Sequence, residues 1–154
     1  MVWSGFRLTD VRAVAALSAR ERRLLAQAAM VLPVTGLLVK RAGYRRLHDA
    51  LSRMVPVAPV PADPLAEATT ISRLVSLAAD RSPIAATCLS QSLALWLLLR
   101  RHGVDADVCL GVRGGTAAPH GHAWVEYQGR PLNEKVDVRN RFLVMNANAP
   151  GPKL

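Results

Sequence analysis

The chain has 154 residues, a formal net charge of +9 and 51% hydrophobic residues. This length suits one domain with a sizeable core, and the hydrophobic content excludes an intrinsically disordered protein. The charge is uneven, because residues 1–55 hold ten Lys/Arg and three Asp/Glu while residues 56–154 hold ten and eight. Since the sequence has no zinc-ligand spacing, helix-turn-helix pattern or aromatic RNA-binding motif, we expect no nucleic-acid partner.

The N-terminal third is expected to be helical and basic. Leu8–Leu25 is rich in Ala, Leu and Arg, which favour helix, and Gly43–Met54 predicts another short basic helix. Leu24–Val39 is almost wholly apolar over 16 residues, but Pro33 and Gly36 interrupt it, which predicts a buried helix pair. Because a membrane span needs about 20 residues, association with a membrane surface is the weaker alternative.

The chain start and the cysteines indicate a cytoplasmic, reducing setting. Met1–Arg7 has no charged region followed by the apolar run of a secretory signal. We therefore expect Cys88 and Cys109 to be free thiols. Cys109 lies in the apolar run Val108–Val112, which predicts a buried strand and a core role for this side chain.

A Pro-rich segment at residues 56–64 separates two parts of the chain. It cannot continue a helix, and its composition predicts a semi-rigid linker. The division is therefore an N-terminal basic helical region at residues 1–55, the linker, and a core at residues 65–154. The prolines are Pro56, Pro59, Pro61 and Pro64.

The core pattern predicts two helices followed by strands. Leu65–Ala79 has helical apolar spacing, and Cys88–His102 is the most hydrophobic helix, ending at Gly103. The expected remaining elements are strands at Asp107–Arg113, His122–Tyr127 and Phe142–Met145, a loop from Gly114, a turn at Gln128–Pro131 and a frayed tail at Ala147–Leu154.

Cys88, His122 and Glu134 follow one another as thiol, imidazole and carboxylate, the order of a cysteine-hydrolase triad. Cys88 stands at a predicted helix start, where the helix dipole favours a thiolate and the Cys88 N–H can donate to an oxyanion. Thr87 can cap that helix. The alternative is a buried thiol on an apolar helix.

The imidazole and the carboxylate each have rivals. His122 opens a strand on which it shares a face with Trp124 and Glu126, so it is either the base or a satisfied core histidine. His120 is a rival base in a predicted loop, while the helical residues His48 and His102 lack evident partners. Glu134 would orient the imidazole, with Asp137 and, more weakly, Glu126 as alternatives. An isolated carboxylate of this kind is otherwise solvated.

Four stretches resemble the lasso-peptide B2 leader peptidases of the transglutaminase-like superfamily. The family's cysteine helix is similar to Cys88–Gly103, and its following strand is similar to Val108–Arg113. Its histidine motif matches Gly121–Glu126, and its acidic segment matches Gly129–Glu134. The motif His-Ala-Trp-Val-Glu together with the cysteine helix at this distance carries the resemblance.

The resemblance implies an α+β papain/transglutaminase-like core, in which a nucleophile helix packs on a small antiparallel sheet. It implies Cys88 as nucleophile, His122 as general base and acid, and Glu134 as the orienting carboxylate. The family position of Glu134 is commonly Asp, which leaves Asp137 as an alternative. Gln91 stands where the family often has Arg, so the resemblance implies no anion site there.

The implied activity is removal of the leader from a ribosomally made lasso precursor through a thioester, with no metal or organic cofactor. The implied partners are the precursor, a separate leader-recognition protein and the lasso cyclase, for which the region at residues 1–55 could be a docking surface. One alternative is a transamidase or another amide hydrolase with the same triad. The other is a non-catalytic binding module that keeps the fold.

Overall fold

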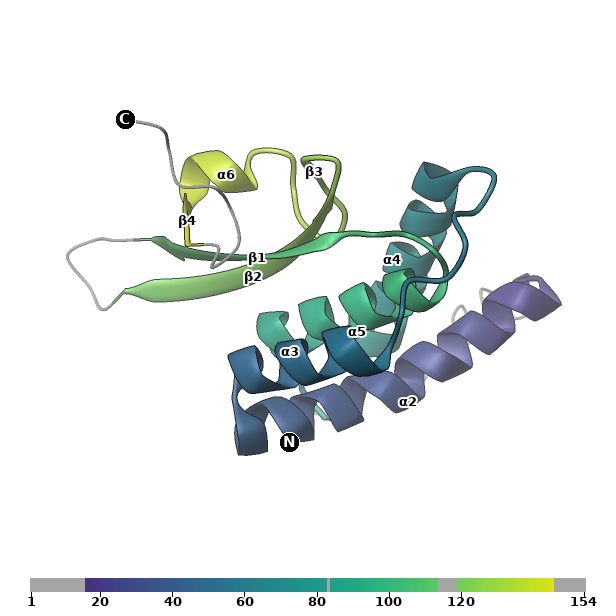
Figure 1. Cartoon of the computed structure of the whole chain (residues 1–154), viewed down its shortest axis with the longest axis horizontal. Coiled ribbons are helices and arrows are strands. Elements are labelled where there is room, and N and C mark those ends of the chain that lie inside the picture. Colours follow the sequence, from purple (N-terminus) through teal and green to yellow (C-terminus); the bar gives the residue numbers. More distant parts are fainter. Residues whose placement is uncertain (1–15, 83, 114–118, 146–154) are drawn as a thin grey trace.

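The computed structural model describes residues 16–82, 84–113 and 119–145. The long helices lie together on one side, and a small antiparallel sheet with a short helix lies on the other (Figure 1). The expected loop at Gly114, the tail at Ala147–Leu154 and the first part of Leu8–Leu25 lie outside the described residues. The elements are α2 (Ala19–Ala42), α3 (Tyr44–Met54), α4 (Pro64–Asp80), α5 (Cys88–Arg101), β1 (Asp107–Arg113), β2 (His120–Tyr127), β3 (Arg130–Pro131), α6 (Val138–Arg141) and β4 (Leu143–Val144).

The first described helix, α2, is continuous, so the prediction of a helix pair over Leu24–Val39 is wrong. Ser18 and Glu21 form a reciprocal capping box at its start. Pro33 lies inside the helix and removes one backbone hydrogen bond without ending it. Packing of the inner face against α4 and α5 maintains the helix across the proline, because tertiary contacts override local propensity.

The outer face of α2 is apolar and exposed, which also corrects the prediction that this run is buried. By length and apolar content α2 could cross a membrane, a test that core helices also pass. The buried side chains are Leu24, Ala28, Leu32 and Thr35. We call the exposed residues Met30, Val34, Leu37 and Leu38 the outer stripe.

The Pro-rich segment after α3 is fixed to the end of α5. Arg100 Nε donates to the Val55 carbonyl, and the Ala58 N–H donates to the Arg100 carbonyl at 3.1 Å. Gly103 has a φ of +77°, and a Cβ built there would lie 2.0 Å from the Pro59 carbonyl oxygen. Glycine therefore both ends α5 and allows the extended segment to lie against it.

The helices predicted for the core are confirmed within one or two residues. Asp63 caps α4 by accepting a hydrogen bond from the Ala66 N–H, with Pro64 in the first turn. α5 is central, because its apolar side chains are almost wholly buried on several faces. The buried residues of the two helices include Ile71, Leu74, Val75, Leu93, Leu95, Leu98 and Leu99, each at most 1% exposed.

The sheet has the strand order β3-β2-β1-β4, and all its pairs are antiparallel. A two-residue turn at Gln128 and Gly129, with φ values of 50° and 76°, joins β2 to β3. Both residues have positive φ, as a tight hairpin turn requires. β4 pairs with β1 at Gly111 and Val112, so the predicted third strand is confirmed in a shorter form.

The two faces of the sheet enter different cores. α5 covers the face that carries Val108 and Val125, which join the main hydrophobic core. The opposite face carries Cys109 and Trp124, which pack with Phe142 in a smaller core. Cys109 is 1% exposed, as the sequence predicted.

The main core is shared between the N-terminal helices and the rest of the chain. Leu24 and Leu32 of α2 lie in the same cluster as Leu93 of α5 and Val125 of β2. The three-part division of the chain therefore remains a prediction about its organisation.

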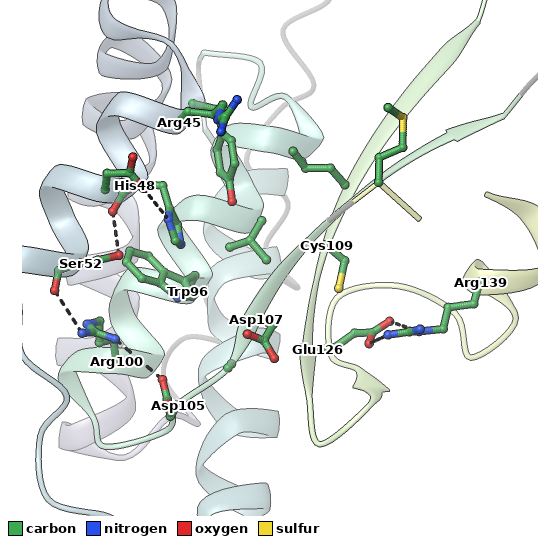
Figure 2. Close-up of a pocket in the computed structure, with 16 residues that line it drawn as sticks. Arg45, His48, Ser52, Trp96, Arg100, Asp105, Asp107, Cys109, Glu126 and Arg139 are labelled. Atoms are coloured by element: carbon green, nitrogen blue, oxygen red, sulfur yellow. Dashed lines mark hydrogen bonds and ion pairs between the residues drawn. The ribbon is translucent and has the colours of Figure 1, made fainter. Parts of the chain in front are cut away.

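A cavity of about 610 Å³ lies between α3, α5 and β1 (Figure 2). Its helical wall carries His48, Trp96 and Arg100, and its sheet side carries Asp107 and Cys109.

Candidate active site

Cys88 is the first residue of α5, where the sequence predicted it. Thr87 Oγ1 accepts a hydrogen bond from the Ser90 N–H at 3.1 Å, which confirms the N-cap. The first helical hydrogen bond runs from Gln91 N–H to Thr87, so the N–H groups of Cys88 and Leu89 precede it. The half-buried thiol thus lies at the electropositive N-terminal end of the helix.

His122 lies on β2 directly opposite Gly111 of β1. Its ring stacks near Phe142 and Trp124, at centroid distances of 5.0 and 6.1 Å. A Cβ at Gly111 would lie 2.8 Å from Phe142 Cβ and from the Trp124 ring. The glycine therefore makes room for the aromatic layer that supports the imidazole.

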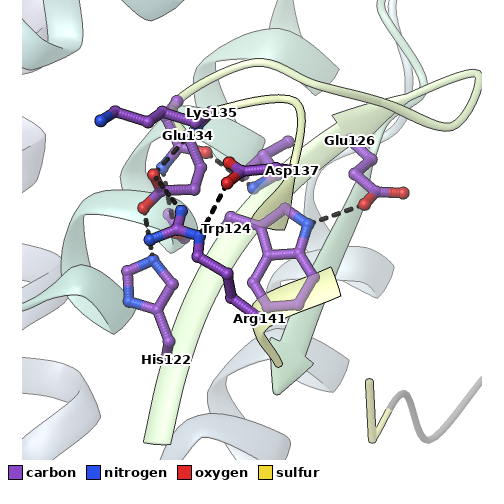
Figure 3. Close-up of polar contacts among 10 residues, drawn as sticks. His122, Trp124, Glu126, Glu134, Lys135, Asp137 and Arg141 are labelled. Carbon is purple, nitrogen blue, oxygen red and sulfur yellow. Dashed lines mark hydrogen bonds and ion pairs between the residues drawn. The ribbon is translucent and has the colours of Figure 1, made fainter. Parts of the chain in front are cut away.

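Glu134 contacts the imidazole, with 2.7 Å between His122 Nε2 and Glu134 Oε2 (Figure 3). A carboxylate only accepts hydrogen bonds, so Nε2 must carry the proton. In the neutral ring, Nδ1 is then the nitrogen with a free electron pair. This tautomer is the one that a base acting through Nδ1 requires.

The loop that presents Glu134 is anchored by Asn133 to two other elements. Asn133 Oδ1 accepts a hydrogen bond from the Val125 N–H at 2.8 Å, and its Nδ2 donates to Ser92 Oγ at 3.2 Å. Ser92 is fully buried on α5, four residues after the cysteine. One amide therefore connects the helix that carries Cys88, the strand that carries His122 and the loop that carries Glu134.

The alternative carboxylates have other partners. Asp137 pairs with Arg141 Nε at 3.5 Å, and Glu126 accepts hydrogen bonds from Trp124 Nε1 and from Arg139. Among the candidate carboxylates, Glu134 is thus the one that the structure brings to His122. The rival His120 is exposed at the start of β2, with its ring near Phe142 at 6.3 Å.

The environment of Glu134 favours its ionised form. Burial raises the pKa of this carboxyl, but hydrogen bonds from the Lys135 N–H, His122 and Arg141 outweigh burial and lower its pKa below the ordinary value. Arg141 Nη2 lies 3.2 Å from Glu134 Oε1. Glu134 is therefore a carboxylate at neutral pH and can stabilise an imidazolium.

Cys88 and His122 line one cavity of about 430 Å³. Its wall is mostly apolar, and the backbone of Gly111 and Gly121 forms part of it. Within residues 16–82, 84–113 and 119–145, the Cys88 thiol makes no hydrogen bond. The structure therefore brings Cys88 and His122 to one cavity without a hydrogen bond between the two side chains.

Sequence reasoning missed several residues around the site. Asn133 and Arg141 were not identified, although Asn133 directly precedes the candidate glutamate. His48 and His102 do have partners: His48 stacks on Trp96 at 4.4 Å, and His102 Nδ1 lies 3.3 Å from Glu67. In the described part of the chain, no group of three or more His, Cys, Asp or Glu residues is placed to hold a metal ion.

Comparisons with known proteins indicate the family of the chain. The profile of the Transglutaminase-like superfamily matches residues 29–147. The microcin J25-processing protein McjB of Escherichia coli is 34% identical over 58 residues, which cover 38% of this chain and 27% of that protein. The chain therefore matches about a quarter of the length of this relative. No solved structure matches the chain.

Proposed function

Because the chain belongs to the transglutaminase-like superfamily, we propose that it is a cysteine peptidase that removes the leader from a ribosomally made lasso precursor. The similarity to McjB, a microcin-processing protein, supports a role in lasso-peptide processing. The observation that carries the proposal is the His122–Glu134 hydrogen bond beside a cavity that Cys88 also lines.

The proposed reaction needs no group beyond these residues and water. His122 Nδ1 takes the proton of Cys88, and the thiolate attacks the carbonyl carbon at the leader–core junction. The N–H groups of Cys88 and Leu89 are the donors that could hold the oxyanion. The C–N bond then breaks, the imidazolium gives its proton to the leaving amine, and the leader remains as a thioester on Cys88.

Hydrolysis of the thioester reverses these roles. His122 takes a proton from water, the hydroxide attacks the thioester carbonyl, and the thiol is restored when the leader leaves as a free acid. Glu134 stabilises the imidazolium in both steps, because its lowered pKa maintains its negative charge.

The proposed partners are the precursor, a separate leader-recognition protein and the lasso cyclase, in the cytoplasm. Cys88 and Cys109 are not joined in a disulfide, which is consistent with a reducing compartment. The outer stripe of α2 supports docking of the recognition protein, because exposed apolar patches mark interaction surfaces.

The proposed organisation divides the chain at residues 56–64. Limited proteolysis tests it: cutting within the linker that leaves residues 65–154 resistant would support separable parts. Cutting there followed by rapid digestion of both fragments would contradict it, because the main core includes side chains of α2.

The reaction is tested by mass spectrometry of a candidate lasso precursor incubated with the protein and its recognition partner. Wild type should release free leader acid by cleavage at one junction, and Cys88→Ala should not. Cys109→Ala is the matched control, because Cys109 is a thiol buried in the smaller core. A mass-shifted conjugate would instead indicate transamidation, and absence of cleavage with intact partner binding would contradict the peptidase.

A further inference from the structure

The cavity of about 430 Å³ at Cys88 and the larger cavity of about 610 Å³ lie along the same face of α5. Leu89 lines the first, while Trp96 and Arg100 line the second. Trp96 follows Leu89 by seven residues and Arg100 follows it by eleven. At 3.6 residues per turn, each of the two lies within about 20° of Leu89 around the helix axis. One helix face therefore forms a wall of both cavities.

The opposite wall is also shared. β1 supplies Gly111 and Val112 to the first cavity and Asp107 and Val108 to the second. Leu110 lines both cavities, as does Met145. The two spaces are therefore neighbours along β1, in contact at these two shared side chains.

β1 has an open edge where it borders the larger cavity. β4 covers β1 at Gly111 and Val112, and the Met145 N–H donates to the Leu110 carbonyl at 2.6 Å. Among the described residues, no strand pairs with Asp107 or Val108 on that side. Backbone groups point alternately to the two sides of an antiparallel strand, so those of Val108 point the same way as the Leu110 carbonyl. Such an edge is a template for another extended chain.

The helical wall opposite this edge is aromatic. The His48 ring lies 4.4 Å from the Trp96 ring, centroid to centroid (Figure 2). On its other side the Tyr44 ring lies 5.5 Å from that of His48. Burial raises the pKa of Tyr44 to about 12, and burial lowers the pKa of His48, so both rings are neutral at neutral pH. In the described structure the Tyr44 hydroxyl has no hydrogen-bond partner, so a donor is available beside the edge.

We propose that the two cavities form one groove that binds the substrate as an extended peptide on the open edge of β1, with an apolar or aromatic side chain against Tyr44 and His48. This inference rests on the proposed peptidase function. Trp96 lies about 12 Å from Cys88 along α5 at 1.5 Å per residue. An extended peptide advances about 3.3 Å per residue, so this side chain belongs about four residues from the cleaved bond.

The groove is assigned to the leader side of the bond. The leader acyl group stays attached to Cys88 through attack and hydrolysis, whereas the core peptide departs after the first step. Contacts that hold the leader side thus act in both steps. The edge of β1 would bind the main chain of the leader through hydrogen bonds, and the aromatic wall would select an apolar or aromatic side chain at one position of the leader.

Peptidyl chloromethyl ketones test the groove, because a thiolate displaces their chloride and forms a thioether on the acyl side. The probes are acetyl-pentaalanyl chloromethyl ketone and four relatives with one Phe at the second to fifth residue from the reactive group. With wild type, Phe at the fourth residue should speed alkylation of Cys88 by about 3- to 10-fold, as an aromatic contact of typical strength gives. Tyr44→Ala should abolish this preference.

Tyr127→Ala is the matched control, because Tyr127 is the chain's other tyrosine and is also half-buried against the main core. It should keep the Phe preference. Asp49→Trp is the second variant: its exposed side chain lines the larger cavity, so a bulky ring narrows it without disturbing the core. This variant should also lose the preference.

Iodoacetamide separates the two hypotheses, because it reacts with the thiol without using the groove. Failure of iodoacetamide to label Cys88 faster than an ordinary thiol would contradict the proposed peptidase. Fast labelling together with no Phe preference, or with a preference that Tyr44→Ala and Asp49→Trp leave unchanged, would overturn the groove alone.

Discussion

The Glu134 carboxylate accepts hydrogen bonds from three groups in the site, which are the His122 imidazole, the Arg141 guanidinium and the Lys135 N–H. Its contact with Nε2 selects the tautomer of His122 in which Nδ1 has the free electron pair that the proposed proton transfer needs. Asp137 is three residues away and contacts the same arginine but not the imidazole. The two carboxylates thus provide a natural matched comparison.

Glu134→Gln should lower kcat by about 10²-fold or more, because a neutral amide neither fixes the tautomer nor stabilises the imidazolium. Asp137→Asn, the control, should change kcat less than about threefold. Steady-state kinetics with a precursor that the wild type cleaves measures kcat for both variants. Equal losses in the two variants would contradict the assignment of Glu134.

Glu126 makes stability depend on pH. Burial raises the pKa of this carboxyl, but its bonds to Arg139 and Trp124 outweigh burial and bring its pKa below the ordinary 4.5. A carboxyl with a lower pKa in the folded state stabilises the fold above its unfolded pKa. That stabilisation is lost as pH falls below about 4.5 toward the folded pKa.

Wild type should therefore lose free energy of unfolding between pH 5 and pH 3 more steeply than Glu126→Gln. Urea unfolding at a series of pH values measures the two slopes. Asp105→Asn, at a side chain that is 78% exposed, is the control and should keep the wild-type slope. Parallel curves for wild type and Glu126→Gln would show that the pair with Arg139 does not contribute.

For single residues, the sequence predicts the local secondary structure around Cys88 and His122 better than it predicts which side chains they contact. The helix-start context of Cys88 and the strand context of His122 are local patterns, and the structure has both. The choice between Glu134 and Asp137 depends on a loop that Asn133 fixes through Ser92, which is 41 residues away in the chain. Such a contact has no local sequence signal.

Among the elements, the first turn of α5 is the one on which the proposed chemistry depends. Thr87→Ala removes the side-chain cap and should cost about 1 kcal/mol of stability. Because the cap holds the turn that contains Cys88, alkylation by iodoacetamide should also slow.

Thr69→Ala is the control for that prediction. The Thr69 hydroxyl donates to the Leu65 carbonyl within α4, on an exposed face far from any cap. Its loss should change stability by less than about 0.5 kcal/mol. Urea unfolding and alkylation rates measured on both variants decide whether the cap acts on the thiol.

The end of α5 gives a second prediction at this scale. Gly103 and Gly129 both have positive φ, but a Cβ would meet the Pro59 carbonyl only at Gly103, and nothing within 4 Å at Gly129. Gly103→Ala and Gly129→Ala should each lower the free energy of unfolding by about 1–2 kcal/mol, because alanine disfavours a positive φ. Gly103→Ala should lose about 1–3 kcal/mol more in urea unfolding, because the linker must move. Equal losses would contradict the close approach.

Secondary structure was largely predictable from local patterns. β1 has the predicted bounds, α4 is one residue longer than predicted at each end, and α5 is one residue shorter at its C-terminal end. These bounds were predictable because caps and apolar periodicity are local signals. α2 was not predictable in the same way. Its proline and glycine indicate a break, but packing of Leu24, Ala28 and Leu32 on α4 and α5 outweighs the missing hydrogen bond. That packing involves distant residues.

For the whole molecule, the outer stripe of α2 is the candidate surface for the recognition protein. Val34→Asp combined with Leu37→Asp should weaken binding of a candidate recognition protein about tenfold or more, since a charge opposes burial of the stripe. Both side chains are 54% exposed, so the fold should be unaffected. Isothermal titration calorimetry measures the affinity.

Ala29→Asp is the control, because Ala29 is exposed on the same helix outside the stripe. It should bind as wild type does. If all three substitutions leave the affinity unchanged while precursor cleavage still needs the partner, the partner docks elsewhere on the molecule.

The inner face of α2 has a consequence for how this protein can evolve. The buried Thr35 hydroxyl lies 3.1 Å from the Ser90 carbonyl, in the first turn after Cys88, and a Cβ at Gly36 would lie 3.8 Å from Ser90 Cβ. A methyl group at position 36 would make an ordinary contact, but a longer side chain there needs room that Ser90 occupies, so substitutions at positions 35, 36 and 90 should be coupled. Across relatives these three positions should covary. The residues of the outer stripe on the same helix should instead change together with those of the protein that docks there.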